Sequence, residues 1–165
     1  MTYALTDSPI GPLTLVGEDD ALSGLYMHQG RHVPDAAAFG ERDDAAHPEA
    51  RRQLGEYFAG ERRRFTVPLR ARGSQFQRRV WAALAEIPYG QTCSYGELTA
   101  RLGLAPQAVR AVAGANGRNP ISIIVPCHRV LGADGRLTGY AGGVARKQFL
   151  LDLERPAAAR EQLLF

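Results

Sequence analysis

The stretch Ile123-Ile124-Val125-Pro126-Cys127-His128-Arg129-Val130 decides how the rest of this chain is interpreted. It sets a thiol beside an imidazole and a guanidinium, at the end of an apolar run that excludes water. The thiolate is the nucleophile, and a free thiol is mostly protonated at neutral pH. A neighbouring base and positive charge are therefore what Cys127 needs to become reactive. The alternative is a buried structural cysteine beside a surface histidine, because free cysteines are often simply buried.

The composition limits the class of protein. The 165 residues are 45% hydrophobic, which is enough for a real core in one domain or two small ones. Two cysteines, Cys93 and Cys127, cannot build a disulfide framework, so we expect a cytoplasmic protein. The first residues show no basic and apolar leader, and no apolar run is long enough for a membrane span, so we expect neither signal peptide nor membrane.

The two halves of the chain differ in charge. Residues 1–73 hold nine arginines against eleven acidic residues. Residues 74–165 hold ten arginines and one lysine against six acidic residues, and they also contain Cys127. This asymmetry indicates an anionic partner for the second half, nucleic acid being the commonest, with a solvated basic surface as the alternative.

The first part has the pattern of a β-meander followed by a helix. Short strands are predicted at 3–6, 13–16 and 21–28, separated by turn-forming residues. Residues 30–44 are expected to form a loop, 48–58 a helix, and 65–69 a further strand. A boundary between two domains is expected near residues 71–73.

The second part is mostly helical in pattern. Helices are predicted at 74–87, 94–102, 106–117 and 144–155, and 121–125 is expected to be a buried strand or extended segment. Ser94 with Glu97 forms a capping-box pattern, and Pro106 stands where a helix tolerates proline in its first turn. Two short helices joined by a glycine-containing turn predict a helix-turn-helix, with an ordinary helical hairpin as the alternative.

The second helix of this hairpin is rich in small residues. Only Gln107 and Arg110 have side chains well suited to hydrogen-bond with base edges. We therefore expect this helix to lie close to DNA without much sequence preference.

Cys127 and His128 are adjacent, so their side chains diverge and a bridging water is more plausible than direct contact. A base also wants an orienting carboxylate, and the sequence leaves Glu154 and Asp152 as alternatives. No Cys-x-x-Cys pair exists, and the pair His28 and His32 is interrupted by a glycine, so we expect no metal.

Together these features resemble the O6-alkylguanine-DNA alkyltransferases, the methylated-DNA–protein-cysteine methyltransferases. The resemblance spans nearly the whole chain and is strongest from Phe76 to Glu154. Its motifs stand in order at fitting spacing: Ile87–Gly90, Ser94-Tyr95, Arg110–Val112, Asn119-Pro120, Pro126–Val130 and Gly139–Gly143.

The resemblance implies an α/β fold in two parts. A small N-terminal α/β domain with an antiparallel sheet, residues 1–73, would pack on a mainly helical domain with a helix-turn-helix, residues 74–165. It implies direct-reversal repair of double-stranded DNA, bound in the minor groove by a monomer with no cofactor. A flipped O6-alkylguanine, and also O4-alkylthymine, would give its alkyl group irreversibly to Cys127, once per molecule.

The resemblance also assigns roles. Cys127 would accept the alkyl group, His128 would deprotonate it through water, and Glu154 would orient His128. Asn119 would organise the active-site turn, and Tyr95 would crowd the target phosphate and donate a proton to the leaving purine.

Arg110 would fill the gap left by the flipped base, on a DNA surface shared with Ser94, Tyr95, Gln107 and Ala111. The implied substrate pocket comprises Val130, Tyr140, Ala141, Asn116 and Lys147. Asn116 stands where some relatives have an apolar residue, so a more polar pocket wall is expected.

Two rivals remain on the residues alone. A DNA-binding regulator would use the helix-turn-helix without covalent chemistry, and it leaves the Cys127, His128, Asn119 and Glu154 set unexplained. A cysteine hydrolase would use Cys127 and His128 without DNA, and it leaves Arg110 and Tyr95 unexplained.

Overall fold

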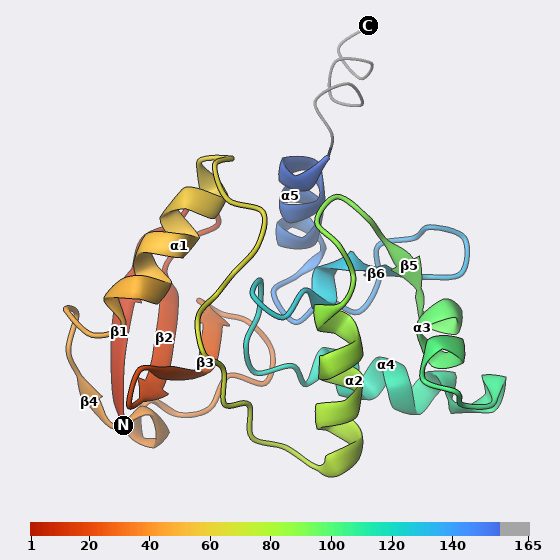
Figure 1. Cartoon of the computed structure of the whole chain (residues 1–165), viewed down its shortest axis with the longest axis horizontal. Helices are drawn as coiled ribbons and strands as arrows, with labels where there is room; N and C mark the ends of the chain where they lie inside the picture. Colours follow the sequence, from red (N-terminus) through yellow and green to blue (C-terminus); the bar gives the residue numbers. More distant parts are fainter. Residues whose placement is uncertain (156–165) are drawn as a thin grey trace, which may run out of the picture.

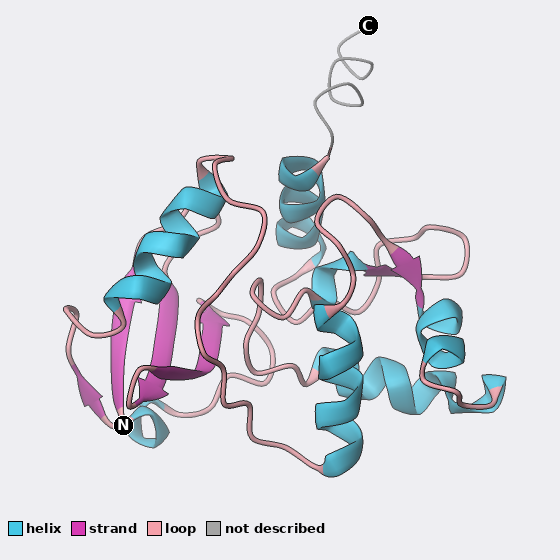
Figure 2. Ribbon diagram, viewed as in Figure 1, coloured by secondary structure: helices cyan, strands magenta, loops and turns pink. Residues whose placement is uncertain are grey.

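A computed structural model describes residues 1–155 (Figure 1). Residues 156–165, the end of the predicted C-terminal domain, lie outside the described part. The strands of the main sheet gather in the N-terminal part and most helices in the C-terminal part (Figure 2). This arrangement confirms the predicted α/β architecture, and no helix within residues 1–155 is both long and apolar enough to cross a membrane.

The N-terminal sheet is the predicted meander with one addition. Strands β1 (Thr2–Thr6), β2 (Leu13–Glu18) and β3 (Ala21–Met27) pair antiparallel in sequence order. Asp19 and Asp20 join β2 to β3 with φ of 50° and 66°, the left-handed pair that matches the twist of a tight hairpin. The expected loop 30–44 in fact contains a 3-10 turn, η1 (Ala36–Phe39), and a two-residue strand, β4 (Glu41–Arg42), parallel to β1.

Helix α1 (Pro48–Phe58) has the predicted bounds and covers the sheet. Its buried stripe includes Ala50, Leu54 and Tyr57. The predicted strand at 65–69 is wrong: only Leu69 makes an isolated bridge, to Leu22. Pro68 has no N–H to donate, so it cannot continue a ladder of hydrogen bonds.

The C-terminal part contains four α-helices among the described residues. They are α2 (Gln75–Ala85), α3 (Tyr95–Arg101), α4 (Val109–Gly117) and α5 (Val144–Glu154), and the 3-10 turn η2 (Pro106–Ala108) leads into α4. Ser74 and Ser94 cap α2 and α3 with complete capping boxes. Gly103, at φ 73°, turns the chain between α3 and the segment that starts α4.

Two short parallel strands, β5 (Cys93–Ser94) and β6 (Val130–Leu131), were not predicted from the sequence. Residues 121–125 are not a strand, because only Ile121 makes a bridge before the chain turns. Ile123 adopts φ 72°, a left-handed conformation that no extended segment has. This turn leads into the 3-10 turn η3 (Cys127–Arg129).

The two parts meet at β3. The backbone N–H of Leu25 donates to the carbonyl oxygen of Pro120 at 2.8 Å, and that of Ser122 donates to the carbonyl of Leu25 at 3.2 Å. Buried apolar side chains from both parts form one continuous cluster. The segment just before Cys127 is thus anchored to the N-terminal sheet.

Candidate active site

Cys127 is the first residue of η3 and is 4% exposed. The turn before it is braced by Asn119, whose Nδ2 donates to the carbonyl of Val125 at 2.8 Å. Oδ1 of Asn119 accepts from the backbone N–H of Ile121 at 3.0 Å. After it, β6 pairs with Cys93, which is also buried and free. The thiol therefore sits on a backbone fixed from both sides.

His128 meets Glu154 rather than Asp152. Nε2 of His128 lies 2.7 Å from Oε2 of Glu154, and both side chains are buried. Asp152 is exposed and contacts Gln148 and Arg155. A carboxylate only accepts, so we assign the ring proton to Nε2. Nδ1 of His128 is buried and has no protein hydrogen-bond partner within the described chain, which leaves it as the acceptor.

The carboxylate of Glu154 is held by two further residues that the sequence analysis did not place beside it. Arg129 donates from Nε to Oε1 at 2.7 Å and from Nη2 to Oε2 at 3.1 Å. The hydroxyl of Tyr57, on α1, also donates to Oε2. Burial alone raises the pKa of Glu154, but the hydrogen bonds and charges of His128 and Arg129 outweigh it and lower the pKa to about 2. Glu154 is therefore ionised at neutral pH.

Lys147 is fully buried beside this site. Its Nζ donates to the carbonyl oxygens of Val130 at 2.6 Å and Thr138 at 3.0 Å. Burial lowers the pKa of Lys147 to about 8, and the nearby Cys127 partly opposes this. The lysine ties β6 to the loop that precedes Tyr140, and it supplies positive charge near the thiol.

Burial sets the resting protonation states. It raises the pKa of the Cys127 thiol, while the Asn119 amide and Lys147 oppose the rise. It lowers the pKa of His128, while Glu154 opposes the fall. The resting pair is a neutral thiol beside a neutral imidazole backed by a carboxylate. In this arrangement Nδ1 of His128 can accept the thiol proton, which leaves a nucleophilic thiolate on Cys127.

Tyr95 and the other predicted pocket residues come from α3, α4, β6 and the loop that contains Tyr140. The hydroxyl of Tyr95, at the start of α3, lies 3.4 Å from the carbonyl oxygen of Thr138 and 3.5 Å from Nδ2 of Asn116. Tyr140 is buried, and burial followed by the charge of Cys127 raises its pKa and that of Tyr95. Val130 is buried and Ala141 half-buried.

The predicted DNA surface lies around α4. Gln107, Arg110 and Ala111 are exposed at its start. Within residues 1–155, no carboxylate lies within ion-pair distance of Arg110. The half-buried Ser94 uses its hydroxyl to cap α3, accepting from the N–H of Glu97 at 3.0 Å. The exposed residues Gln107, Arg110 and Ala111 lie on η2 and the start of α4, a part of the chain that is distant from the N-terminal β-sheet (Figure 1).

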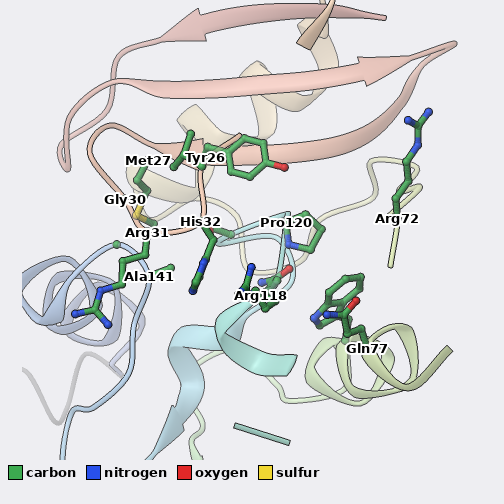
Figure 3. A pocket seen from close by; sticks show the side chains of 15 residues that line it. Tyr26, Met27, Gly30, Arg31, His32, Arg72, Gln77, Arg118, Pro120 and Ala141 are labelled. Carbon is green, nitrogen blue, oxygen red and sulfur yellow. The ribbon is translucent and has the colours of Figure 1, made fainter. Parts of the chain in front are cut away.

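A cavity of about 180 Å³ lies where the two parts of the chain meet. Figure 3 shows Tyr26, Met27 and His32 on its sheet side and Gln77 and Arg118 on its helical side. Arg31 and Arg72 lie at opposite ends of this view and do not converge with Arg118 on one point. Arginines therefore border the cavity, but they are not arranged to bind one anion together.

Sequence reasoning missed Tyr57 as a site residue, and it expected the positive charge of Arg129 to act on the thiol, whereas the guanidinium binds Glu154. Tyr57 fits the apolar stripe of α1, and nothing in the sequence indicates a contact with a residue 97 positions away. Arg129 stands inside the quoted motif, but a surface position fits its pattern equally well. Among the described residues, no group of histidine, cysteine and acidic side chains could hold a metal ion.

Comparison with known proteins identifies similar sequences over both parts. Residues 75–156 match the DNA-binding domain of 6-O-methylguanine DNA methyltransferase, and residues 1–71 match its ribonuclease-like domain. A methylated-DNA–protein-cysteine methyltransferase of Mycolicibacterium paratuberculosis is 53% identical over 99% of this chain and 98% of its own length. A protein of the same name from Methanosarcina acetivorans is 51% identical over 93% of this chain and 98% of its own.

Solved structures agree with the sequence matches. The Mycobacterium tuberculosis OGT crystallised in complex with DNA superposes with a TM-score of 0.89, at 52% identity over 93% of each chain. The structure of the Mycobacterium tuberculosis O6-methylguanine methyltransferase gives a TM-score of 0.86, at 50% identity over 97% of this chain and 98% of that one.

Proposed function

The chain belongs to the 6-O-methylguanine DNA methyltransferase family, and from this premise we propose that it repairs alkylated DNA by taking the alkyl group onto Cys127. This membership confirms the resemblance derived from the motifs. The observation that carries the choice of acceptor is that the buried Cys127 directly precedes His128, whose imidazole is buried and makes a 2.7 Å hydrogen bond with Glu154. The other cysteine, Cys93, has no imidazole beside it in the sequence.

The proposed reaction is an in-line displacement. The thiol proton passes through a water molecule to Nδ1 of His128, and Glu154 stabilises the imidazolium from the other side of the ring. The thiolate sulfur forms a bond to the alkyl carbon as the bond between that carbon and O6 of guanine breaks. The leaving purine takes a proton, which we assign to the Tyr95 hydroxyl, and the Tyr95 phenolate regains a proton through water as the His128 imidazolium releases its own. The product thioether is a poor leaving group, so each molecule reacts once.

The remaining residues position this step. Asn119 would fix the turn that carries the sulfur. Its hydrogen bonds to Ile121 and Val125, on the two sides of the turn, support this role. We assign the pocket for the base to Val130, Tyr140, Ala141, Asn116 and Lys147. Lys147 contributes positive charge that favours the thiolate.

We propose that double-stranded DNA binds along α4 through its minor groove. A base stacked in a duplex cannot reach Cys127, so the damaged nucleotide must be flipped out. Arg110 would fill the gap, and Ser94, Tyr95, Gln107 and Ala111 would contact the strand. This surface has few side chains that could recognise bases, which suits a protein that must scan any sequence. Contacts to phosphates supply affinity without sequence specificity.

We further propose that residues 1–73 and 74–165 are two domains of a cytoplasmic monomer that needs no cofactor. O4-alkylthymine would be a second substrate. The alternative of a helix-turn-helix regulator without covalent chemistry is not favoured, because the named relatives are methyltransferases.

Intact-mass spectrometry tests the proposal directly. The protein is incubated with duplex DNA that contains O6-methylguanine, and in a second arm O4-methylthymine, and peptide mapping locates any added methyl group. We expect one methyl per molecule on Cys127. Cys127→Ser should gain none while still binding the duplex, and the matched control Cys93→Ser should react like the parent protein. Methyl gain by Cys127→Ser would refute the choice of acceptor.

A further inference from the structure

One hydrogen bond joins the N-terminal helix to the proposed proton relay. The hydroxyl of Tyr57, on α1, donates to Oε2 of Glu154, on α5. The same oxygen lies 2.7 Å from Nε2 of His128. The N-terminal part thus reaches the carboxylate that faces the active-site imidazole.

The Tyr57 hydroxyl is fixed by its surroundings. Its ring is fully buried and packs against Phe58, Phe65 and Tyr89, with ring centroids 5.3, 5.4 and 6.2 Å apart. Burial, with the charge of Glu154, raises the pKa of Tyr57 far above its ordinary value, so the hydroxyl keeps its proton at any working pH. It is a permanent donor in a fixed direction.

Three residues donate hydrogen bonds to the carboxylate of Glu154 and so share its negative charge. An ionised carboxylate has only acceptor sites, and His128, Arg129 and Tyr57 provide the hydrogen bonds that they receive. Arg129 bridges both oxygens, whereas Tyr57 and His128 share Oε2. Each donor that shares this oxygen reduces the negative charge left to stabilise a proton on the imidazole.

We propose that Tyr57 is a positioning residue for alkyl transfer, which sets through Glu154 how strongly the relay holds a proton on His128. The N-terminal part would then take a direct part in the chemistry besides supporting the fold. This inference rests on the proposed function of Cys127 and His128. The other charged or titratable groups around the relay are Arg129 beside Glu154 and His128, Tyr89 beside Tyr57, and Lys147 near His128 and Cys127. Tyr140 is also close enough for the charges of Cys127 and Glu154 to act on it. The test leaves all of these groups unchanged.

The test is Tyr57→Phe, which removes one oxygen atom and keeps the ring in its aromatic cluster. Without the hydroxyl, more of the charge on Oε2 faces His128, so its imidazolium becomes more stable. The pH at which the ring takes up a proton, followed by NMR of labelled histidine, should rise by about half a unit. This is less than the roughly one to two units that a hydrogen bond to a charged group represents, because Tyr57 acts on the ring only through Glu154. The acid limb of the single-turnover rate of methyl transfer should move upward by a similar amount.

Tyr3→Phe is the control, because it removes a hydroxyl from a half-buried tyrosine of strand β1, in the same N-terminal part of the chain. It should leave both profiles in place. A lower melting temperature of Tyr57→Phe with an unmoved histidine titration and an unmoved acid limb would overturn the proposal and leave Tyr57 a structural residue. The NMR titration needs no DNA, so it still tests the Tyr57 contact if the parent protein gains no methyl group and the proposed function fails.

Discussion

The side-chain amide of Asn119 donates to the carbonyl oxygen of Val125 at 2.8 Å, across the turn that ends at Cys127. Its Oδ1 accepts from the N–H of Ile121 at 3.0 Å, so one buried side chain supplies both a donor and an acceptor to a backbone without regular pairing. Buried backbone groups need partners, and here a side chain replaces the ladder that a strand would provide.

Asn119→Ala should therefore destabilise the protein. The N–H of Ile121 loses its acceptor in a buried site, which costs about 1–3 kcal/mol of unfolding free energy. Urea denaturation measures the loss, and methyl transfer should slow because the sulfur is no longer held in place. Gln91→Ala removes an exposed amide and should change stability by less than about 0.5 kcal/mol. Equal stabilities for the two variants would contradict the bracing role.

Ile123 combines backbone strain with burial in the same turn. Its φ of 72° is unfavourable for a β-branched residue by about 1–2 kcal/mol, which glycine would relieve. Its side chain, however, is 1% exposed, and removing a buried isoleucine costs about 2–5 kcal/mol.

Ile123→Gly should therefore be less stable than the parent protein, because lost burial outweighs strain relief. Thermal and urea unfolding measure the change. Ile124→Gly at the next, half-buried position provides the comparison without strain relief. A more stable Ile123→Gly would show that strain dominates this turn.

The sequence predicted those elements whose signals are local. The capping boxes at Ser74 and Ser94 and the apolar stripe of α1 depend on residues within a few positions of one another, and these helices were found with bounds close to those observed. The predicted strand at 65–69 and the buried strand or extended segment expected at 121–125 are wrong, because apolar composition does not reveal tertiary partners. Pro68 interrupts the first, and Ile123 turns the chain in the second.

The site was predictable only as far as motifs extend. The residues alone left Glu154 and Asp152 as alternative carboxylates to orient His128, and the family resemblance selected Glu154. Tyr57 could not be found, because its contact with Glu154 depends on how α1 meets α5. A tyrosine on a buried helical stripe gives the same pattern whether its hydroxyl meets a carboxylate or a backbone carbonyl.

Acid should destabilise the fold through His128 and Glu154. Burial lowers the pKa of His128 in the folded state, so the unfolded chain binds more protons below its ordinary pKa near 6.5. The pKa of Glu154 falls from 4.5 to about 2, so its contribution is present above 4.5 and is lost as pH falls toward 2. Unfolding free energy should therefore decrease from pH 7 to pH 3 in urea titrations. His32→Gln, which removes an exposed histidine, should leave the profile unchanged; a flat parent profile would contradict the assignment.

DNA affinity should fall with salt. Each phosphate neutralised by a basic side chain releases a counterion, and log K falls against log salt concentration with a slope of about −0.9 per contact. Cys127→Ser allows reversible binding to be measured without covalent reaction. A response independent of salt between low and physiological concentrations would argue against phosphate contacts by the basic C-terminal part.

Arg110→Ala should separate base flipping from chemistry. Arg110 is exposed at the start of α4 and lies outside the Cys127, His128 and Glu154 relay, so its loss leaves the thiol chemistry intact. Repair of a duplex should slow by roughly tenfold, because nothing fills the gap left by the extruded base. Reaction with free O6-methylguanine base, which needs no extrusion, should keep the parent rate. Arg52→Ala removes the same charge from α1 and should alter neither rate. Equal losses of rate on duplex and free base in Arg110→Ala would contradict the role of Arg110 in filling the gap left by the flipped base.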